Sequence, residues 1–323
     1  MKVIKGLNSI LAPPARGAAL TIGNFDGLHL GHRALVGEIV REAKAQGLES
    51  VLLTFDPHPV QFLQPGQNLR RLFPLEDLVS QAEGMGLDQL VIEEFNQELA
   101  EMSPEEFWQK RVQPRLKPQL LVVGHDFNFG AGRKGNLRFL EKLSHSQGFE
   151  LRVVPPVHQD GDVVSSSRIR ALVEEGQVDE VPSLLGRPFA IVGTVTQGQK
   201  KGRDLGFPTA NIENVPTMVP ARGVYVTETM VPSGRRVTSI TNVGLAPTLR
   251  KTDSGLRLET HLLEEGDWSI YNEKIRVNFC CRLRDEMKFP AIQDLKDQIE
   301  KDVREAREYW HKTKVKKSGP KSP

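Results

Sequence analysis

The chain has 323 residues, enough for about two domains that each bury a core of their own. Hydrophobic residues make up 38% and charged residues 26%, which is typical of a globular protein and argues against a largely disordered chain. The formal net charge of +2 excludes a surface that attracts polyanions over its whole extent. The charge is uneven, because the first 186 residues are acidic overall and the last twelve contain five lysines and no acid.

Short apolar runs alternate with helix-like segments through the first half of the chain. The segments between the runs repeat apolar residues at helical spacing. One of them, Ser103–Val112, opens with Ser-Pro-Glu-Glu, a helix-start signal. Buried strands alternating with helices predict an α/β domain, a parallel sheet with helices on both faces. The apolar runs are residues 18–23, 51–55, 89–92, 120–124 and 151–154.

The pattern changes near residue 186. From Phe189 onward, strand-like segments are separated by glycine and proline without a long helix, which predicts a mostly antiparallel sheet or small barrel. A C-terminal helix should follow, because Ile292, Leu295 and Ile299 recur at helical spacing. The Lys-, Ser- and Pro-rich end predicts a basic disordered tail. The predicted domains are residues 1–185 and 186–311, followed by the tail at 312–323.

Two features of the sequence bear on the compartment. The two cysteines, Cys280 and Cys281, are adjacent in a predicted strand, where neighbouring side chains point to opposite faces. We therefore expect neither a mutual disulfide nor a shared metal site, which fits a reducing compartment. No stretch approaches the ~20 apolar residues of a membrane helix, and the start is not a convincing signal peptide. The sequence thus predicts a cytoplasmic protein with no membrane partner.

The segment Thr21–Arg33, TIGNFDGLHLGHR, carries the first chemical signal. It joins a predicted strand to a predicted helix, and its glycines permit a tight turn and close approach by a ligand. His29 and His32 fall at the helix start, where backbone amides and the helix dipole favour an anion. Two imidazoles there can donate hydrogen bonds to a nucleotide phosphate. Zinc is the competing interpretation, and it is weak because no cysteine is near and no third ligand is evident.

The string HLGH resembles the HxGH signature of the nucleotidyltransferase superfamily, whose members attack the α-phosphate of a nucleoside triphosphate. A wider set of strings is more specific. Over residues 1–185 it resembles the FMN adenylyltransferase module of the bacterial bifunctional riboflavin kinase/FAD synthetase family, which implies a Rossmann-like fold. The strings are GNFDGLHLGHRAL, FDPHP at Phe55–Pro59, VVGHDFNFGAGRKG at Val122–Gly135 and SSSRIR at Ser165–Arg170.

This resemblance implies a role for each string. The hydroxyl and guanidinium groups of SSSRIR suit triphosphate oxygens, and Phe127 and Phe129 would form a flavin-facing wall. From the residues alone, SSSR also fits a plain helix cap, DPHP a simple turn and the phenylalanine pair ordinary packing. The predicted catalytic residues are His29, His32 and Arg170. The predicted nucleotide-binding residues are Gly23, Asn24, Phe25, Asp26, His29, His32, Ser166, Ser167, Arg168 and Arg170, and the flavin-binding residues are Asp56, His58 and Asn128.

A second signal lies in Gly198–Ile212, GQKKGRDLGFPTANI. Its basic, glycine-bearing loop fits either a solvated surface or a flap over phosphates. Thr209 and Asn211 are two residues apart in a predicted strand, so they project to one face and offer neutral oxygens that suit Mg²⁺. The segment resembles the riboflavin kinase signature GR-x-LGFPTAN. The strings PARGVYV, NVGLAPT, ETHLL and LRDEMKF follow in that family's order, so the resemblance covers residues 187–310.

The second resemblance implies the kinase residues. Glu259 of ETHLL would be the catalytic base, although a glutamate on a strand is ordinarily a surface residue. Thr209 and Asn211 would bind Mg²⁺ and the nucleotide, and Gly202 and Arg203 would also contact the nucleotide.

Together the two resemblances predict a bifunctional enzyme of flavin-cofactor synthesis. One domain would phosphorylate riboflavin to FMN, and the other would adenylate FMN to FAD with release of pyrophosphate. ATP would be the co-substrate and Mg²⁺ the cofactor. We expect no nucleic-acid partner for the folded domains, because the basic charge lies in the tail. Two alternatives stay open: an HxGH transferase with a different acceptor, and a non-catalytic flavin-binding protein.

Overall fold

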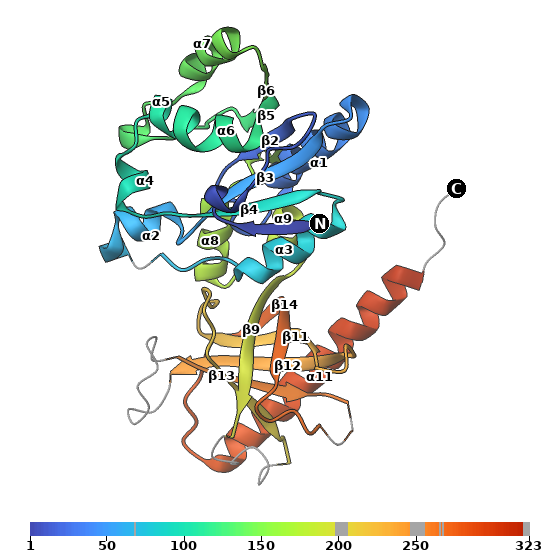
Figure 1. Ribbon diagram of the computed structural model, residues 1–323. Coiled ribbons are helices and arrows are strands. Elements are labelled where there is room, and N and C mark those ends of the chain that lie inside the picture. The colour runs from blue at the N-terminus through green and yellow to red at the C-terminus, as the bar shows by residue number, and fades with distance from the viewer. Residues whose placement is uncertain (68, 198–205, 246–255, 265, 267, 319–323) are drawn as a thin grey trace. The chain divides into compact units, whose positions relative to one another are not determined.

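The computed structural model describes residues 1–67, 69–197, 206–245, 256–264, 266 and 268–318 (Figure 1). The chain divides into two compact units, Met1–Ser166 and Ser167–Pro323. The helix α8 (Ser166–Glu175) begins at this boundary, and α9 (Val181–Leu185) follows it. The functional limits after residues 185 and 311 stay a prediction.

A six-stranded parallel sheet forms the centre of the first unit. The strand order is β1-β4-β3-β2-β5-β6, and every neighbouring pair is parallel. The central strand β2 is apolar and buried at every residue, and the parallel pairing of all six strands confirms the predicted sheet. The strands are β1 (Lys2–Lys5), β2 (Ala18–Ile22), β3 (Glu49–Asp56), β4 (Gln89–Glu94), β5 (Pro118–Gly124) and β6 (Glu150–Val154), with β7 (His158–Gln159) and β8 (Asp162–Val163) as a separate pair.

Helices cover both faces of this sheet, as predicted (Figure 1). Alternate strand residues point to opposite faces, so each face has its own hydrophobic cluster. Leu52 packs in one cluster with Val36 of α1, and Leu53 packs in the other with Trp108. The helices are α1 (Leu30–Gln46), α2 (Pro59–Leu63), α3 (Leu75–Gly84), α4 (Gln97–Glu101), α5 (Pro104–Glu106), α6 (Gln113–Leu116) and α7 (Leu137–Gln147), with 3-10 turns η1 (Leu7–Ser9), η2 (Pro65–Gln67) and η4 (Ala131–Arg133).

The helix predicted from Ser103 starts as expected and then winds differently. Ser103 Oγ accepts from the Glu106 amide at 3.1 Å, and the Glu106 carboxylate accepts from the Ser103 amide at 3.2 Å. After α5 the chain forms a π-helical segment, η3 (Phe107–Val112), before α6. Within it, Trp108 is fully buried and stacks on Phe149 with 4.7 Å between ring centroids. A capping box therefore predicts where a helix begins but not its pitch.

A closed antiparallel barrel forms the second unit, which confirms the predicted barrel. Its strand order is β10-β13-β12-β11-β14-β9. Five fully buried hydroxyls form an unbroken row of hydrogen bonds inside the barrel, with 2.8 or 2.9 Å between successive oxygens. The hydroxyls follow one another in the order Thr229, Ser239, Thr227, Thr241 and Thr260. The strands are β9 (Phe189–Thr196), β10 (Thr209–Glu213), β11 (Gly223–Met230), β12 (Arg236–Leu245), β13 (Leu256–Leu262) and β14 (Lys274–Arg284).

The predicted C-terminal helix, α11 (Ile292–Ser318), packs against the barrel. Val226 of β11 and Ala306 of α11 share one hydrophobic cluster. Asp302 of α11 is 3% exposed, and its carboxylate accepts a forked hydrogen bond from Arg284 of β14, with 2.7 Å between Nη2 and Oδ2. Apolar packing and a buried ion pair therefore both fasten α11 to the barrel.

The helix continues beyond the predicted start of the tail. Residues 312–318, predicted to be disordered, are helical, and residues 319–323 lie outside the described part. Lysine is a good helix former, and Lys312 lies 3.8 Å from Glu308 one turn earlier, which supports the continued winding. The basic composition was thus a poor guide to where the helix ends.

The adjacent cysteines also differ from the expectation that they point to opposite faces. On β11, Val226 and Thr227 pair with Cys281 and Phe279 of β14, so Cys280 is an extra residue in the ladder. Such a bulge interrupts the alternation of faces. Both cysteine side chains consequently pack, partly buried, in the cluster that contains Ala306. Neither is in a disulfide.

Candidate active sites

Three of the motif strings meet at one edge of the parallel sheet. β3, β2 and β5 are neighbours, so their carboxyl ends lie side by side. The Gly23–His32 turn follows β2, the DPHP segment follows β3 and GHDFNFG follows β5. After β2 the chain builds β3 and β4 on one side and then returns to β5 on the other. Ligands of open α/β sheets bind at such a switch point.

The turn after β2 has an unusual backbone. Gly27 has a φ of 83°, and Phe25 and Leu28 also have positive φ values of 40° and 43°. Such conformations are unfavourable for residues with side chains and need support from the surroundings. Here the support is packing, because Phe25 and Leu28 are both 1% exposed. The turn delivers His29 to the start of α1.

The two predicted catalytic histidines lie against each other. The rings of His29 and His32 stack with 3.7 Å between centroids, and His29 Nδ1 accepts from the His32 amide at 3.3 Å. A Cβ on Gly31 would lie 3.1 Å from the His29 ring, so glycine leaves the room that this ring needs. Burial, and then the neighbouring His29, lower the pKa of His32 well below its ordinary value. His32 is therefore neutral near neutral pH and can donate one hydrogen bond without carrying charge.

Asp26 supports the turn from behind. Both carboxylate oxygens accept from the Leu72 amide, at 3.0 and 3.1 Å, and the side chain is buried. The Asp26 carbonyl accepts from Ser166 Oγ at 3.1 Å, which brings the start of SSSRIR to the same turn. Asn24 is exposed, and its carbonyl accepts from Thr54 Oγ1 at 3.3 Å. Asp26 thus holds the shape of the turn, whereas Asn24 is open to solvent.

The remaining predicted phosphate ligands belong to α8. Ser167 is exposed, and Arg168 and Arg170 are partly buried in the same helix. Gly23, at the other end of the turn, donates its amide to the Leu53 carbonyl at 3.1 Å. Of the hydroxyls of SSSRIR, that of Ser166 at the start of α8 contacts the turn.

The two polar residues of DPHP have different environments. Asp56 ends β3 with its carboxylate half exposed, and Arg71 Nη2 lies 2.8 Å from its Oδ1. His58 is buried and caps α2, because its Nδ1 accepts from the Val60 amide at 3.2 Å. The Gln61 side chain completes this cap by accepting from the His58 amide at 3.2 Å. Asp56 is therefore accessible to a ligand, whereas the His58 side chain stabilises the start of α2.

The loop after β5 presents an aromatic pair. The rings of Phe127 and Phe129 stack with 5.6 Å between centroids. Phe129 contacts Phe107 at 5.8 Å, and Phe107 contacts Phe55, at the end of β3, at 6.3 Å. Asn128, which lies between the two phenylalanines in the sequence, is exposed. Its side-chain amide donates to the Asp126 carbonyl at 2.6 Å. A continuous aromatic series therefore joins the loops after β3 and β5.

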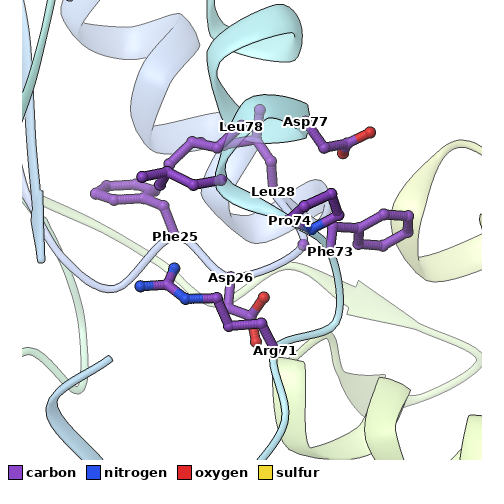
Figure 2. A pocket seen from close by; sticks show the side chains of 10 residues that line it. Phe25, Asp26, Leu28, Arg71, Phe73, Pro74, Asp77 and Leu78 are labelled. Atoms are coloured by element: carbon purple, nitrogen blue, oxygen red, sulfur yellow. The ribbon is translucent and has the colours of Figure 1, made fainter. Parts of the chain in front are cut away.

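A small pocket, open to solvent, adjoins the turn after β2 (Figure 2). The turn forms one wall, and the start of α3 with the segment before it forms the other. Asp26 and Arg71 both line it, so it lies on the supporting side of the turn. The lining residues are Phe25, Asp26, Gly27, Leu28, Arg71, Phe73, Pro74, Leu75, Asp77 and Leu78.

In the barrel, the predicted kinase residues meet across neighbouring strands. Asn211 of β10 lies opposite Glu259 of β13, and Glu259 lies opposite Asn242 of β12. Residues directly opposite each other project to the same face, and Thr209 shares that face because it is two residues from Asn211. The Glu259 side chain is 18% exposed, and its Oε1 forms an ion pair with Arg257.

This set of side chains suits a hard cation. Thr209 offers a hydroxyl and Asn211 an amide oxygen, neutral oxygen ligands that suit Mg²⁺. Mg²⁺ takes about six ligands and usually keeps several from water and phosphate, so a partial protein set fits an ion shared with a nucleotide. The other predicted nucleotide contacts, Gly202 and Arg203, lie outside the described residues.

One residue of this site was missed by the reasoning from sequence. His261 lies opposite Thr209 in the ladder, and its Nδ1 is 2.8 Å from the Pro208 carbonyl oxygen. Because a carbonyl only accepts, Nδ1 carries the proton. Burial lowers the pKa of His261, although this hydrogen bond partly opposes the effect. His261 is part of the ETHLL string, but only the register of β10 and β13 shows that it lies next to Pro208 and Thr209 of the FPTAN string.

Known proteins match both units. A family model described as FAD synthetase matches residues 12–168, and one described as riboflavin kinase matches residues 185–310. The chain is 37% identical to a bifunctional riboflavin kinase/FMN adenylyltransferase of Pseudomonas fluorescens, over 95% of this chain and 97% of the relative. It is 33% identical to the protein of the same description from Escherichia coli K12, over 97% of this chain and 99% of the relative.

A solved structure is also similar over both units. It is described as a macrolide-efflux protein from Streptococcus pneumoniae, and it matches with a TM-score of 0.83 and 28% identity over 95% of this chain and 99% of that one. In the part of the chain that the structure describes, no helix is long and apolar enough to span a membrane.

The fold, the two sites and the family models define a transferase with two catalytic domains. The chain belongs to the bifunctional riboflavin kinase/FMN adenylyltransferase family.

Proposed function

We propose that residues 186–311 make FMN and residues 1–185 make FAD, with the residues named above. The observation that carries the proposal is the stacking of His29 on His32 at the switch point of the sheet, in a chain whose barrel sets Glu259 opposite Asn211. The matched domains support it, since FAD synthetase comes first and riboflavin kinase second.

In the kinase site, Glu259 accepts the proton of the terminal ribityl hydroxyl of riboflavin while that oxygen attacks the γ-phosphorus of ATP. The bond from the γ-phosphorus to the bridging oxygen breaks, and ADP leaves. Arg257 contacts Oε1 of Glu259, so Oε2 is the oxygen available for the proton. Thr209 and Asn211 hold Mg²⁺ together with the ATP phosphates, and Gly202 and Arg203 contact the nucleotide. When bound, Mg²⁺ neutralises charge on the transferred phosphoryl group.

In the adenylyltransferase site, a phosphate oxygen of FMN attacks the α-phosphorus of ATP, and the bond to pyrophosphate breaks. This nucleophile is already anionic, so the chain need not supply a base. His29 and His32 donate hydrogen bonds where negative charge develops on the phosphate, and Arg168 and Arg170 supply guanidinium groups. The nucleotide contacts also include Gly23, Asn24, Phe25, Ser166 and Ser167, with Asp26 holding the turn, and the flavin contacts include Asp56, His58 and Asn128.

The setting of the enzyme is part of the same proposal. We place it in the cytoplasm, where ATP is made and where Cys280 and Cys281 would stay reduced. The functional domains are residues 1–185 and 186–311, which the matched ranges 12–168 and 185–310 support. We propose no nucleic-acid or membrane partner for the folded domains.

The first test is incubation with riboflavin, ATP and Mg²⁺, followed by chromatography of the flavins. We expect FMN and then FAD, and no product when Mg²⁺ is removed by a chelator. Absence of both products with Mg²⁺ present would favour a non-catalytic flavin-binding protein. Pyrophosphate release only with another acceptor would favour the other alternative.

Two substitutions test the assignment of residues to reactions. His29→Ala should lower FAD formation by about 10²-fold or more, because it removes a donor to the developing charge, and should leave FMN formation unchanged. Glu259→Ala should abolish FMN formation and leave FAD formation from supplied FMN intact. If each variant impaired both reactions equally, the two-site assignment would be wrong.

A further inference from the structure

A short segment before α3 contacts both motif turns of the adenylyltransferase site. It comprises residues 69–73, which no motif string includes. The Leu69 carbonyl accepts from Gln61 Nε2 at 2.7 Å, and Gln61 also completes the cap of His58. Two residues later, Arg71 and Leu72 reach the carboxylates at the ends of β3 and in the turn after β2. The segment therefore links the turn assigned to the flavin with the turn assigned to the nucleotide.

Arg71 makes the contact with the flavin side. Its Nη2 lies 2.8 Å from Asp56 Oδ1 and 2.9 Å from the Phe55 carbonyl oxygen, so one nitrogen fixes both side chain and backbone at the end of β3. The Arg71 side chain is 12% exposed, whereas the carboxylate of Asp56 is 51% exposed. The guanidinium is thus held in the protein while the carboxylate remains accessible.

Leu72 makes the contact with the nucleotide side. Its amide donates to both carboxylate oxygens of Asp26, and its own side chain is fully buried. Consecutive Cα atoms are about 3.8 Å apart and joined by a rigid peptide, so a contact at Arg71 and one at Leu72 cannot move independently. Figure 2 shows Arg71 and Asp26 among the side chains that line the pocket, together with Phe73 of the same segment.

We propose that Arg71 is a positioning residue of the adenylyltransferase site, which sets the placement of the Asp56 turn relative to the Asp26 turn. The inference rests on the proposed function, in which these turns hold FMN and ATP. Transfer requires the FMN phosphate in line with the α-phosphorus of ATP, and a misplacement of about 1 Å can cost about 10²-fold in rate. A half-exposed ion pair adds only about 0–1 kcal/mol of stability, so a purely structural role predicts little change in either reaction.

The experiment compares Arg71→Met, Asp56→Asn and the double variant in the full chain, with Arg152→Met as the matched control. Arg152 pairs with Glu38, Glu42 and Glu150, so its loss removes more ion pairs than the loss of Arg71. Initial rates of FAD formation from FMN and ATP, and of FMN formation from riboflavin, are measured on the same preparations. Substrate concentrations are varied so that kcat and KM separate.

We expect Arg71→Met to lower kcat of FAD formation by about 10- to 100-fold, with FMN formation within about twofold of wild type. Because Arg71 acts through Asp56, adding Arg71→Met to Asp56→Asn should lower kcat little further. Arg152→Met should leave both reactions near wild type.

The inference would be overturned if FAD formation by Arg71→Met stayed within about twofold of wild type, or if Arg152→Met lost as much. Effects of Arg71→Met and Asp56→Asn that multiply would overturn it too. A rise in KM for FMN without a fall in kcat would make Arg71 a substrate contact and overturn the positioning role as well. A wild-type chain that forms no FAD would instead refute the proposed function, so the two failures are distinguishable.

Discussion

His261 connects the two strands that carry the kinase residues. It lies on β13 two residues after Glu259. Its Nδ1–H donates a hydrogen bond to the carbonyl of Pro208, the residue before Thr209, at 2.8 Å. In the ladder it lies opposite Thr209, one of the proposed metal ligands. Its effect on catalysis should therefore pass through the position of Thr209.

Substitutions of His261 can separate this hydrogen bond from the imidazole itself. His261→Leu should raise KM for ATP in FMN formation by about five- to tenfold, because a lost hydrogen bond costs about 1 kcal/mol. His261→Asn should stay within about threefold of wild type, because its amide nitrogen can take the place of Nδ1 as donor. Steady-state kinetics at varied ATP measures both, with FAD formation from supplied FMN as the internal control. Equal KM values in the two variants would contradict the positioning role.

Glu93 is a buried carboxyl that belongs to neither site. Its Oε2 accepts from the Leu7 amide at 2.5 Å, and Arg111 Nη1 lies 3.9 Å from its Oε1. Burial raises the pKa of Glu93 above its ordinary value of 4.5, with the Leu7 amide and Arg111 opposing the effect. The folded chain therefore binds this proton more tightly than the unfolded chain does.

This shift predicts a pH dependence of stability. The contribution of Glu93 to the free energy of unfolding is present below its unfolded pKa and is lost as the pH rises through the raised pKa. Glu93→Gln cannot titrate, so its stability relative to wild type should increase between about pH 4 and pH 7. Urea unfolding at a series of pH values measures the difference. A difference that does not change with pH would show that Glu93 contributes nothing to the profile.

At the scale of whole elements, the local patterns of the sequence predicted most of the architecture. Strand–helix alternation predicts the parallel sheet, and glycine- and proline-separated strands predict the barrel. The motif strings also name the site residues, such as Asn211 and Glu259. Their pairing could not be predicted, because it depends on which strands of the barrel are neighbours, a long-range property. The bulge at Cys280 and the π-helical η3 leave no local signal, so they were missed as well.

The attachment of α11 depends on the buried pair of Arg284 and Asp302. Breaking such a pair leaves an uncompensated buried charge, so Asp302→Ala should lower the free energy of unfolding by about 3 kcal/mol. Replacing both residues by apolar ones, Arg284→Met with Asp302→Leu, should cost less than the single change. Chemical unfolding of the full chain measures all variants. Glu305→Ala is the control, because its exposed partner Lys301, at 3.9 Å, contributes little. A double variant less stable than Asp302→Ala would contradict this account.

At the scale of the whole molecule, the proposed catalytic histidines and the proposed catalytic glutamate lie in different units, each with its own core. The stacked histidines lie in the unit built on the parallel sheet, and Glu259 lies in the unit built on the barrel. The product of one site is the substrate of the other. Damage to one site should therefore leave the other one working.

This separation predicts complementation between molecules. His29→Ala alone should accumulate FMN from riboflavin, and Glu259→Ala alone should make neither FMN nor FAD from riboflavin. A mixture of the two variants should form FAD at a rate that rises with enzyme concentration, because FMN must pass through solution from one molecule to the other. Chromatography of the flavins over time follows the reaction. A mixture that makes FMN but no FAD would show that FMN does not leave the first molecule in a usable form.

The row of buried hydroxyls in the barrel has an evolutionary consequence. Loss of one member, such as Thr241, would remove one of the two partners of Thr227 and the hydroxyl partner of Thr260, at a cost of about 1–3 kcal/mol for an unsatisfied group. Exchange of all members for apolar residues of the same shape can be nearly neutral. Each single step between the two states crosses a less stable intermediate. Descendants of this barrel should therefore keep the hydroxyls as a set or lose them as a set.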